Sequence, residues 1–338
     1  MKVLLYDTTN AFLTPGGKTT HAQKLKKEIG RLGIDIDFGR WWDKSQQGAD
    51  LIHFLSVNPI MLKTVRALGI KSFYSMIFDF ETNRSLLHQR KAILKTRLFD
   101  MMPKGVRNMA WWHALPYVDR VQFMHAQDRD CALRFYPKQL TMDRTVIIPH
   151  AYDPDDMFIS DGLDINEKNL PDRYLISCAN ISPRKQTLKL ARLAKLAKVP
   201  VVFMGGHNPC DPYFKAFEAE VDNRYVFYPG YVEKEWRDCI ERNASGYVLL
   251  SLGESGCIAV YEAAAYQMPL LLSNLPWAWG YDRPTDIYFC DQDDEAKAVE
   301  QIADFYVKSG HLDHKPFNAM TWAEVARLYV SEYERLFA

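Results

Sequence analysis

Residues 246–274 contain the side chains whose types and spacing point most directly to chemistry. An apolar run leads into Gly253-Glu254-Ser255-Gly256, a helical pattern follows, and Glu262 stands eight positions after Glu254. Amides at the start of a helix bind phosphate, and a glycine such as Gly256 lets the backbone approach a ligand closely. The amides expected to do so are those of Ser255, Gly256, Cys257 and Ile258. Two carboxylates would repel phosphate, so they suit the hydroxyls of a sugar or a ribose; the alternative for Glu254 is an acid that stabilises the helix dipole.

A pair of cations follows another predicted strand, at residues 174–179. Arg184 and Lys185 come directly after Ser182-Pro183. Adjacent positive charges at the end of a strand can neutralise a diphosphate. The alternative is a solvated Arg-Lys pair, and the position after a strand in the same half of the chain favours the binding role.

Near the N-terminus, Pro15-Gly16-Gly17 follows the first predicted strand. A Gly-Gly loop before a helix can approach a phosphate or a sugar, and an ordinary turn is the alternative. The chain lacks both the G-x-G-x-x-G fingerprint and the Walker lysine motif, which argues against a nicotinamide dehydrogenase. Asp35-Ile36-Asp37 falls within a predicted strand and is interpreted as ordinary alternation, so no metal site is expected.

Short apolar runs alternate with amphipathic segments along the chain, the pattern of parallel sheets covered by helices. Strands are predicted at residues 2–6, 34–38, 51–55, 72–77, 120–124 and 145–148, and again at 174–179, 200–204, 225–228, 247–251 and 269–273. Helices are predicted at 20–31, opened by a capping box at Thr20, and at 85–100, 187–197, 234–243, 257–267 and 322–337. A polar linker, 153–172, separates the two series. The sequence therefore predicts an α/β fold with two Rossmann-like domains, whose ligands bind at the carboxyl ends of strands.

The composition limits the function classes. A chain of 338 residues without net charge suits two domains and argues against a general nucleic-acid binder. The six cysteines form no C-x-x-C pair, which favours free thiols in a reducing compartment. The first residues lack a signal-peptide core, and no apolar run reaches the roughly 20 residues that cross a bilayer. A cytoplasmic protein is expected.

At these motifs the chain resembles the family-four glycosyltransferases, retaining enzymes of the B-type fold, in which two Rossmann-like domains face a cleft. The resemblance spans nearly the whole chain and is most specific from Glu254 to Glu262. The other matching segments are 16–17, 50–53, 146–153, 182–185, 229–232 and 321–324. The resemblance implies domains at 1–160 and 171–318, and a C-terminal helix, 319–338, that crosses back onto the first domain.

The resemblance also implies roles for the candidate residues. Lys185, with Arg184, binds the donor diphosphate. Glu254 and the amides after it hold the transferred sugar and its phosphate, so these three residues are the expected catalytic set. Glu262 is expected to bind the ribose hydroxyls, and the backbone near Tyr231 to hold the base.

Some positions depart from the family pattern. Gly16 and Gly17 match and are expected to close over the donor from the other domain. Asn180 stands where the family has a phosphate-binding arginine, and remains a candidate donor contact. Phe78 stands where the family has a histidine that contacts the sugar. The candidate substitutes for that histidine are His53 and His125.

These roles imply transfer of a sugar from a nucleotide sugar to a hydroxyl of a saccharide or lipid-linked acceptor, in glycan or polysaccharide biosynthesis. No cofactor and no metal are expected, because the cations and amides would stabilise the departing diphosphate electrostatically. A nucleotide-sugar epimerase shares this architecture. A non-catalytic subunit that binds a nucleotide sugar is a further alternative, because Asn180 and Phe78 depart from the pattern.

Residues 84–112 combine seven Lys or Arg residues with one acid, Asp100, and with apolar side chains that include Trp111 and Trp112. Exposed apolar and Trp side chains among cations suit an anionic membrane surface, so a peripheral position at the inner face of the membrane is predicted. One alternative is a helix that packs its apolar side on the sheet and solvates its basic face. The other is a surface that guides a soluble anionic acceptor.

Overall fold

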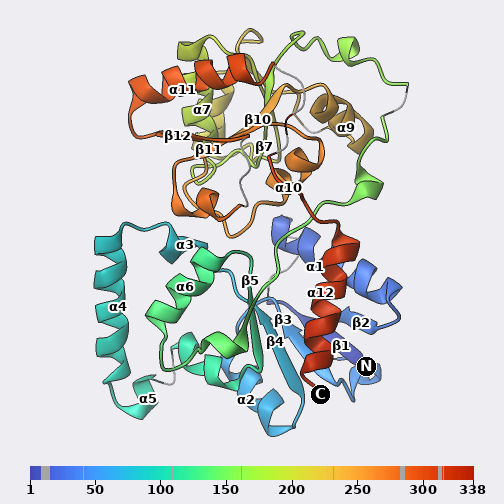
Figure 1. Cartoon of the computed structure of the whole chain (residues 1–338), viewed down its shortest axis with the longest axis vertical. Coiled ribbons are helices and arrows are strands. Elements are labelled where there is room, and N and C mark those ends of the chain that lie inside the picture. The colour runs from blue at the N-terminus through green and yellow to red at the C-terminus, as the bar shows by residue number, and fades with distance from the viewer. Residues whose placement is uncertain are drawn as a thin grey trace. The chain divides into compact units, whose positions relative to one another are not determined.

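The computed structural model describes residues 1–8, 16–40, 42–107, 110–160, 162–230, 232–281, 286–310, 314 and 316–338, with the backbone alone at 79 and 80 (Figure 1). The chain divides into two compact units, one formed by Met1–His150 with Thr321–Ala338 and the other by Ala151–Met320. Each unit has a six-stranded parallel sheet with helices around it, which confirms the predicted α/β class with two Rossmann-like domains. None of the described helices is long and apolar enough to span a bilayer.

The first unit is built on a sheet with the strand order β2-β1-β3-β4-β5-β6. Its strands are β1 (Lys2–Tyr6), β2 (Asp35–Phe38), β3 (Leu51–Phe54), β4 (Lys71–Ser75), β5 (Arg120–Phe123) and β6 (Thr145–Ile147). All four residues of β3 are buried, as expected for a parallel strand covered on both faces. The helices are α1 (Gly17–Arg31), α2 (Pro59–Ala67), α3 (Asp79–Thr82), α4 (Leu86–Asp100), α5 (Lys104–Arg107), α6 (Ala126–Phe135) and α12 (Trp322–Arg335).

Helix α1 begins earlier than the sequence predicts. Gly16 is the residue before its first turn and Gly17 is its first residue, so Thr20 already lies inside the helix. The Thr20 hydroxyl donates to the Gly16 carbonyl at 3.3 Å and caps nothing, so the predicted capping box is wrong. A capping box does open α12, where Thr321 and Glu324 exchange hydrogen bonds. Helix α12 packs on α1 within the first unit (Figure 1).

The second unit has the strand order β12-β11-β10-β7-β8-β9. Its strands are β7 (Leu175–Cys178), β8 (Val201–Met204), β9 (Val226–Phe227), β10 (Gly246–Leu249), β11 (Leu270–Ser273) and β12 (Ile287–Cys290). Its helices are α7 (Thr187–Ala197), α8 (Pro212–Glu218), α9 (Lys234–Arg242), α10 (Ile258–Ala265) and α11 (Glu295–Lys308). Strand β12 and helix α11, which packs beside α7, were not predicted. Numbered within this unit, the order is 6-5-4-1-2-3, that of a dinucleotide-binding Rossmann fold.

Residues 151–160 belong to the second unit, although the sequence analysis places them in the first domain. The end of this stretch is held by Asp238, a buried residue of α9. Its carboxylate accepts hydrogen bonds from the amides of Phe158, Ile159 and Ser160 at 2.7, 3.0 and 3.0 Å. These bonds fasten the start of the connecting segment to α9.

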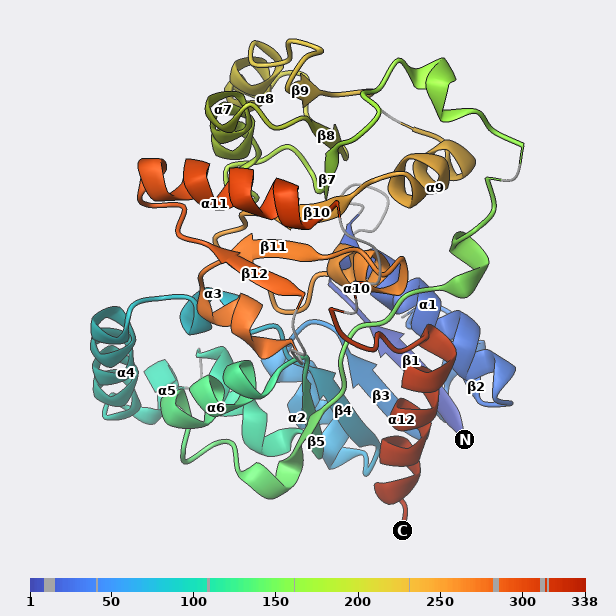
Figure 2. The same ribbon diagram turned by 45° about the horizontal axis from the view of Figure 1, so that its top comes forward.

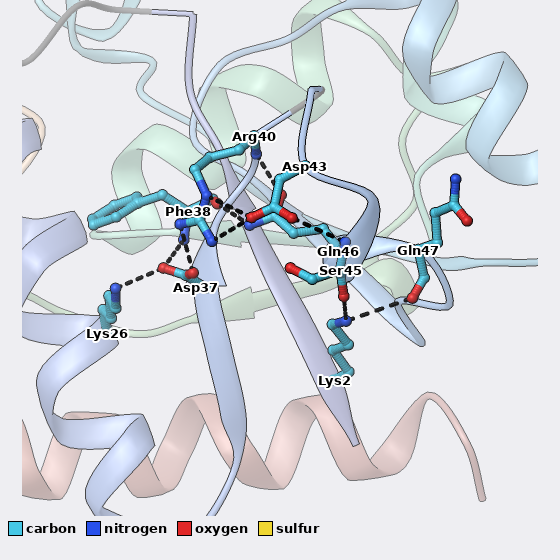
Figure 3. A network of polar contacts seen from close by, with 9 residues as sticks. All are labelled: Lys2, Lys26, Asp37, Phe38, Arg40, Asp43, Ser45, Gln46 and Gln47. Carbon is cyan, nitrogen blue, oxygen red and sulfur yellow. Dashed lines mark hydrogen bonds and ion pairs between the residues drawn. The ribbon is translucent and has the colours of Figure 1, made fainter.

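The Asp35-Ile36-Asp37 motif lies in β2, and Asp37 is bound by cations (Figure 3). Its Oδ1 lies 2.6 Å from Lys26 Nζ and its Oδ2 lies 2.7 Å from Arg40 Nη1. Burial acts to raise the pKa of Asp37, but hydrogen bonds from Lys26, Phe38 and Arg40 outweigh it and lower the pKa to about 2. Arg40 also pairs with Asp43 at 3.0 Å, so the motif ties the end of β2 to the segment that follows.

Three buried histidines lie beneath α12 in the first unit. His21 and His150 bring their Nδ1 atoms to 3.1 Å, and His53 Nδ1 lies 2.7 Å from the Tyr333 hydroxyl. Burial lowers the pKa of His21 and of His53 to about 3, and lowers that of His150 well below its ordinary value. All three rings are therefore neutral at physiological pH and act as hydrogen-bonding core residues.

The first unit should lose stability in mild acid because of these rings. Unfolded histidine takes up a proton near pH 6.5, whereas folded His53 does so only near pH 3. Its contribution is complete above about pH 6.5 and falls as the pH drops toward 3. Between about pH 7.5 and 5, the free energy of unfolding of the parent should fall by about 2 kcal/mol more than that of the His53→Gln variant, which lacks this ring. Urea unfolding at the two pH values measures both losses. His88→Gln, at an exposed position of α4, is the control; an unchanged pH dependence in His53→Gln would contradict the assignment.

Candidate functional site

The second unit brings two of the predicted motifs to neighbouring strands. Strands β7 and β10 are adjacent and parallel, and the winding of the chain reverses between them. In open parallel sheets ligands bind at this reversal, outside the carboxyl ends of the strands. Arg184 and Lys185 follow β7, and Glu254 follows β10. The two motifs therefore meet where a Rossmann fold binds its ligand.

Two glycines let the backbone take the required course. A β-carbon on Gly205, just after β8, would lie 2.1 Å from the Ala179 carbonyl oxygen, so no side chain fits there. The segment after β7 can thus run against the end of β8, where the Ile181 amide donates to the Gly206 carbonyl at 2.9 Å. Gly256 has a φ of 109°, which favours glycine, and it turns the segment after β10 into α10.

An ion pair joins the two motifs. Lys185 Nζ lies 2.7 Å from Glu254 Oε1, and the two side chains are only 11% and 7% exposed. Arg184 Nη1 lies 2.9 Å from the same oxygen, but its side chain is 53% exposed. The Ser251 hydroxyl donates to this oxygen as well, at 2.5 Å. Glu254 is therefore the common acceptor of both cations.

The backbone ties the motifs together as well. The Leu252 amide donates to the Arg184 carbonyl at 2.9 Å, and Arg184 Nη1 donates to the Gly253 carbonyl at 2.8 Å. The Ser251 carbonyl in turn accepts from the Ser273 hydroxyl and from the Trp277 indole, at 2.7 and 3.0 Å. These hydrogen bonds fix the backbone on both sides of the ion pair, and the sequence analysis did not predict them.

The surroundings keep Lys185 charged. Burial acts to lower the pKa of Lys185, but the neighbouring Cys257 and Glu254 outweigh it, and the pKa lies above its ordinary value. Burial raises the pKa of the Cys257 thiol, which lies 3.9 Å from Lys185 Nζ. The site therefore holds an ammonium group at neutral pH, as an anionic ligand requires.

The start of α10 differs from the expectation in one respect. The Cys257 amide donates to the Tyr281 hydroxyl at 3.1 Å, so this predicted phosphate contact is already used within the protein. Ser255 is buried, whereas Gly256 and Ile258 are partly exposed. Gly256 and Ile258 therefore remain the candidates for amide contacts at the start of α10, because the Cys257 amide is already used.

Glu262, on α10, has a partner that the sequence analysis missed. Its Oε2 lies 2.5 Å from Arg237 Nη2, and Arg237 Nε contacts Glu241 at 2.9 Å. The charge of Glu262 raises the pKa of Arg237 well above its ordinary value. Arg237 is on α9, 25 positions from Glu262, and no sequence spacing links the two. An arginine thus holds the carboxylate predicted to bind the ribose.

The other predicted residues lie in varied settings. Asn180 is exposed after β7, close to Gly206. His53 is wholly buried in the first unit, and its two ring nitrogens lie 2.7 Å from the Tyr333 and Ser75 hydroxyls. It therefore offers no surface to a sugar, and that expectation is corrected. His125 is buried just before α6. Tyr231 lies outside the described residues.

The comparisons with known proteins agree with this architecture. No protein-family model and no curated protein matches the sequence. Among solved structures, sucrose-phosphate synthase from Thermosynechococcus elongatus matches at 14% identity over 99% of both chains, with a TM-score of 0.73. The Burkholderia xenovorans α,α-trehalose-phosphate synthase with glucose-6-phosphate matches at 11% identity over 99% of this chain and 100% of that one, with a TM-score of 0.67. Anabaena HepE in complex with UDP and glucose matches at 13% identity over 99% of this chain and 100% of that one, with a TM-score of 0.59.

These similarities define the class of fold. They extend over nearly the whole length of each chain, at identities too low to show more than the fold. The chain has the two-domain fold of the B-type glycosyltransferases, as the sequence resemblance implies.

The two cations around Glu254 should contribute unequally to stability. Glu254→Gln should lower the free energy of unfolding by about 1.5–3 kcal/mol, because it leaves the buried Lys185 ammonium without its charged partner. Arg184→Ala should cost less than about 1 kcal/mol, because solvent screens the exposed guanidinium. Urea unfolding with a double-mutant cycle, adding Lys185→Met, should show coupling between Lys185 and Glu254. Equal losses for the Arg184 and Glu254 variants would contradict this ranking.

Proposed function

We propose that this chain is a glycosyltransferase that moves a sugar from a nucleotide-sugar donor to an acceptor hydroxyl, with retention of the anomeric configuration. The observation that carries the proposal is the meeting of Lys185, Arg184 and Glu254 at the strand reversal of a Rossmann-like unit. The presence of UDP and glucose in a similar fold, that of Anabaena HepE, supports a nucleotide sugar as the ligand. The reaction belongs to glycan or polysaccharide biosynthesis.

Lys185 and Arg184 divide the work of holding the diphosphate. The buried Lys185 is fixed by Glu254 and supplies a positioned charge. Arg184 is half exposed, so its guanidinium can donate to a phosphate from the nitrogens other than Nη1, which Glu254 and the Gly253 carbonyl hold. The amides of Gly256 and Ile258 add uncharged donors at the start of α10. Glu254, which cannot approach phosphate, accepts hydrogen bonds from the transferred sugar.

The chemical step needs a positioned donor more than a protein nucleophile. The bond between the anomeric carbon and the diphosphate oxygen breaks, and the leaving diphosphate gains negative charge. Lys185, Arg184 and the helix amides stabilise that charge. The acceptor oxygen bonds to the anomeric carbon from the same face, and its proton passes to a phosphate oxygen.

Glu262 and Arg237 form the nucleoside end of the proposed site. A carboxylate accepts hydrogen bonds from two adjacent ribose hydroxyls, and Arg237 fixes the orientation of this one. The backbone around residue 231 is proposed to hold the base. Gly16 and Gly17 remain proposed contacts of the donor, and His125 remains a proposed contact of the sugar or the acceptor.

The remaining parts of the proposal concern partners and location. The acceptor is a saccharide or a lipid-linked saccharide, and neither a metal nor a cofactor takes part. The six cysteines are free thiols, which is compatible with the proposed cytoplasmic location. The proposed peripheral contact with the inner face of the membrane concerns the first unit alone.

Lys185→Ala and Glu262→Ala should each weaken donor binding by about 10- to 150-fold, because each removes a charge-assisted hydrogen bond worth about 1.5–3 kcal/mol. Lys185→Ala should also lower turnover. The measurement is isothermal titration with the nucleotide sugar that gives the largest thermal shift. Lys189→Ala and Glu300→Ala, on α7 and α11, are the matched controls. Unchanged donor affinity in both test variants would refute the site.

The function itself is tested with a panel of UDP-, GDP-, ADP- and TDP-sugars. Binding of one of them to the folded chain should raise its melting temperature. NMR of the product made with a saccharide acceptor should then show the anomeric configuration of the donor. Inverted product would contradict retention. An epimerised donor formed without acceptor would show an epimerase, and binding with neither transfer nor slow donor hydrolysis would show a non-catalytic subunit.

A further inference from the structure

Helix α4 turns a face of mixed polar and apolar residues toward the first unit, where Ala92 and Ile93 pack against the hydrophobic core. Its buried and half-buried positions, apart from the terminal Asp100, are Gln89, Ala92, Ile93, Thr96 and Phe99. They recur every three or four residues and so form one face of the helix, which packs against α6. In both views α4 lies at the outer margin of this unit (Figures 1 and 2). The alternative of one apolar side packed inward therefore describes α4 only in part, because its apolar residues are not confined to this face.

The opposite face of α4 carries an exposed apolar stripe. Leu87, Leu94 and Leu98 are 60%, 57% and 54% exposed. Their spacings of seven and four residues place them on one line along an α-helix. Met101, 81% exposed, continues the line just past the end of the helix. A leucine on the packed face of a helix is normally buried. The high exposed fractions of these side chains therefore show that no other part of the described chain covers the stripe.

Exposed cations flank the stripe on both sides. Lys91 and Lys95 lie along one side of it, and Arg90 and Arg97 along the other, as helical spacing dictates. The single acid of the helix, Asp100, is turned away from this face. Its carboxylate accepts hydrogen bonds from Trp112, His113 and Gln139 at 3.0, 2.9 and 3.2 Å. The outer face is thus apolar along its middle and positive along both margins.

The exposed surface involves fewer residues than the predicted segment, 84–112. Trp111 and Trp112 are partly buried and pack against Tyr136, with ring centroids 5.3 and 5.8 Å away. They anchor the segment to the first unit and are not the exposed tryptophans that the sequence analysis expects. The exposed Lys104 and Val106 of α5 complete the surface, which spans residues 86–106.

We propose that this face of α4, with α5, docks on an anionic lipid bilayer. The helix would lie in the plane of the membrane, with the leucines among the upper acyl chains and the cations at the phosphates. A second copy of the chain would oppose cations with cations, and a soluble anion would leave the leucines in water. Docking of this kind would bring the enzyme of the proposed function to a lipid-linked acceptor, but it does not depend on the donor site.

Sedimentation of the full chain with vesicles tests the proposal. The chain should bind phosphatidylcholine vesicles that contain phosphatidylglycerol at low salt, release them at high salt, and bind pure phosphatidylcholine far less. Lys91→Glu/Lys95→Glu should weaken binding by at least about 30-fold. Leu94→Ser/Leu98→Ser should weaken it by at least about 10-fold without changing the charge. Both variants should keep the melting temperature of the parent, because they alter exposed side chains.

Lys198→Glu/Lys215→Glu, at exposed positions of the second unit, changes the net charge by the same amount and should bind like the parent. Absence of binding to anionic vesicles at low salt would overturn the proposal. So would equal binding to neutral vesicles, equal loss in the control, or self-association that the serine variant abolishes. A nucleotide-sugar thermal shift on the same samples keeps the proposals separate, since donor binding can fail while vesicle binding persists.

Discussion

The ion pair between Lys185 and Glu254 is the contact on which the candidate site depends. A buried ammonium is tolerated only with a charged partner, and Glu254 is the nearest one. The pair can form only because β7 and β10 are adjacent, which follows from the strand order of the second unit. Gly205 and Gly256 then allow the backbone to bring the two side chains together. Topology, backbone and charge are therefore linked at one point.

In the first unit, the polar side chains that are buried beneath α12 include neutral rings. Its buried polar residues beneath α12 are histidines and tyrosines that share hydrogen bonds, and burial keeps the histidines uncharged. This arrangement lets α12, the last helix of the chain, pack over His53 of β3 without burying a charge on that ring. The second unit thus buries a charged pair at the candidate site, whereas the first unit buries these histidines without charge.

Features that depend on the local pattern of the sequence, such as strands, were mostly predicted. Apolar runs at residues 2–6 and 269–273 identified strands, and the spacing of Glu254 and Glu262 indicated a candidate site that stays a prediction. The missed features depend on contacts between distant segments. Arg237 meets Glu262 from another helix, and the Tyr281 hydroxyl takes the Cys257 amide from beyond β11. His53 follows a strand pattern perfectly, but only the position of α12 shows that its ring is enclosed.

Helix α4 shows why periodicity alone misjudged one surface. A helix with one apolar face packs that face inward, and its sequence then indicates its orientation. Helix α4 has apolar residues on two opposite faces, because Ile93 and Phe99 point inward and Leu94 and Leu98 point outward. Its sequence thus fits either orientation. Asp100 decides the matter, because its hydrogen bonds to Trp112, His113 and Gln139 fix the rotation of the last turn. This anchor directs Leu94 and Leu98 outward. Helical spacing then places the exposed cations on either side of them.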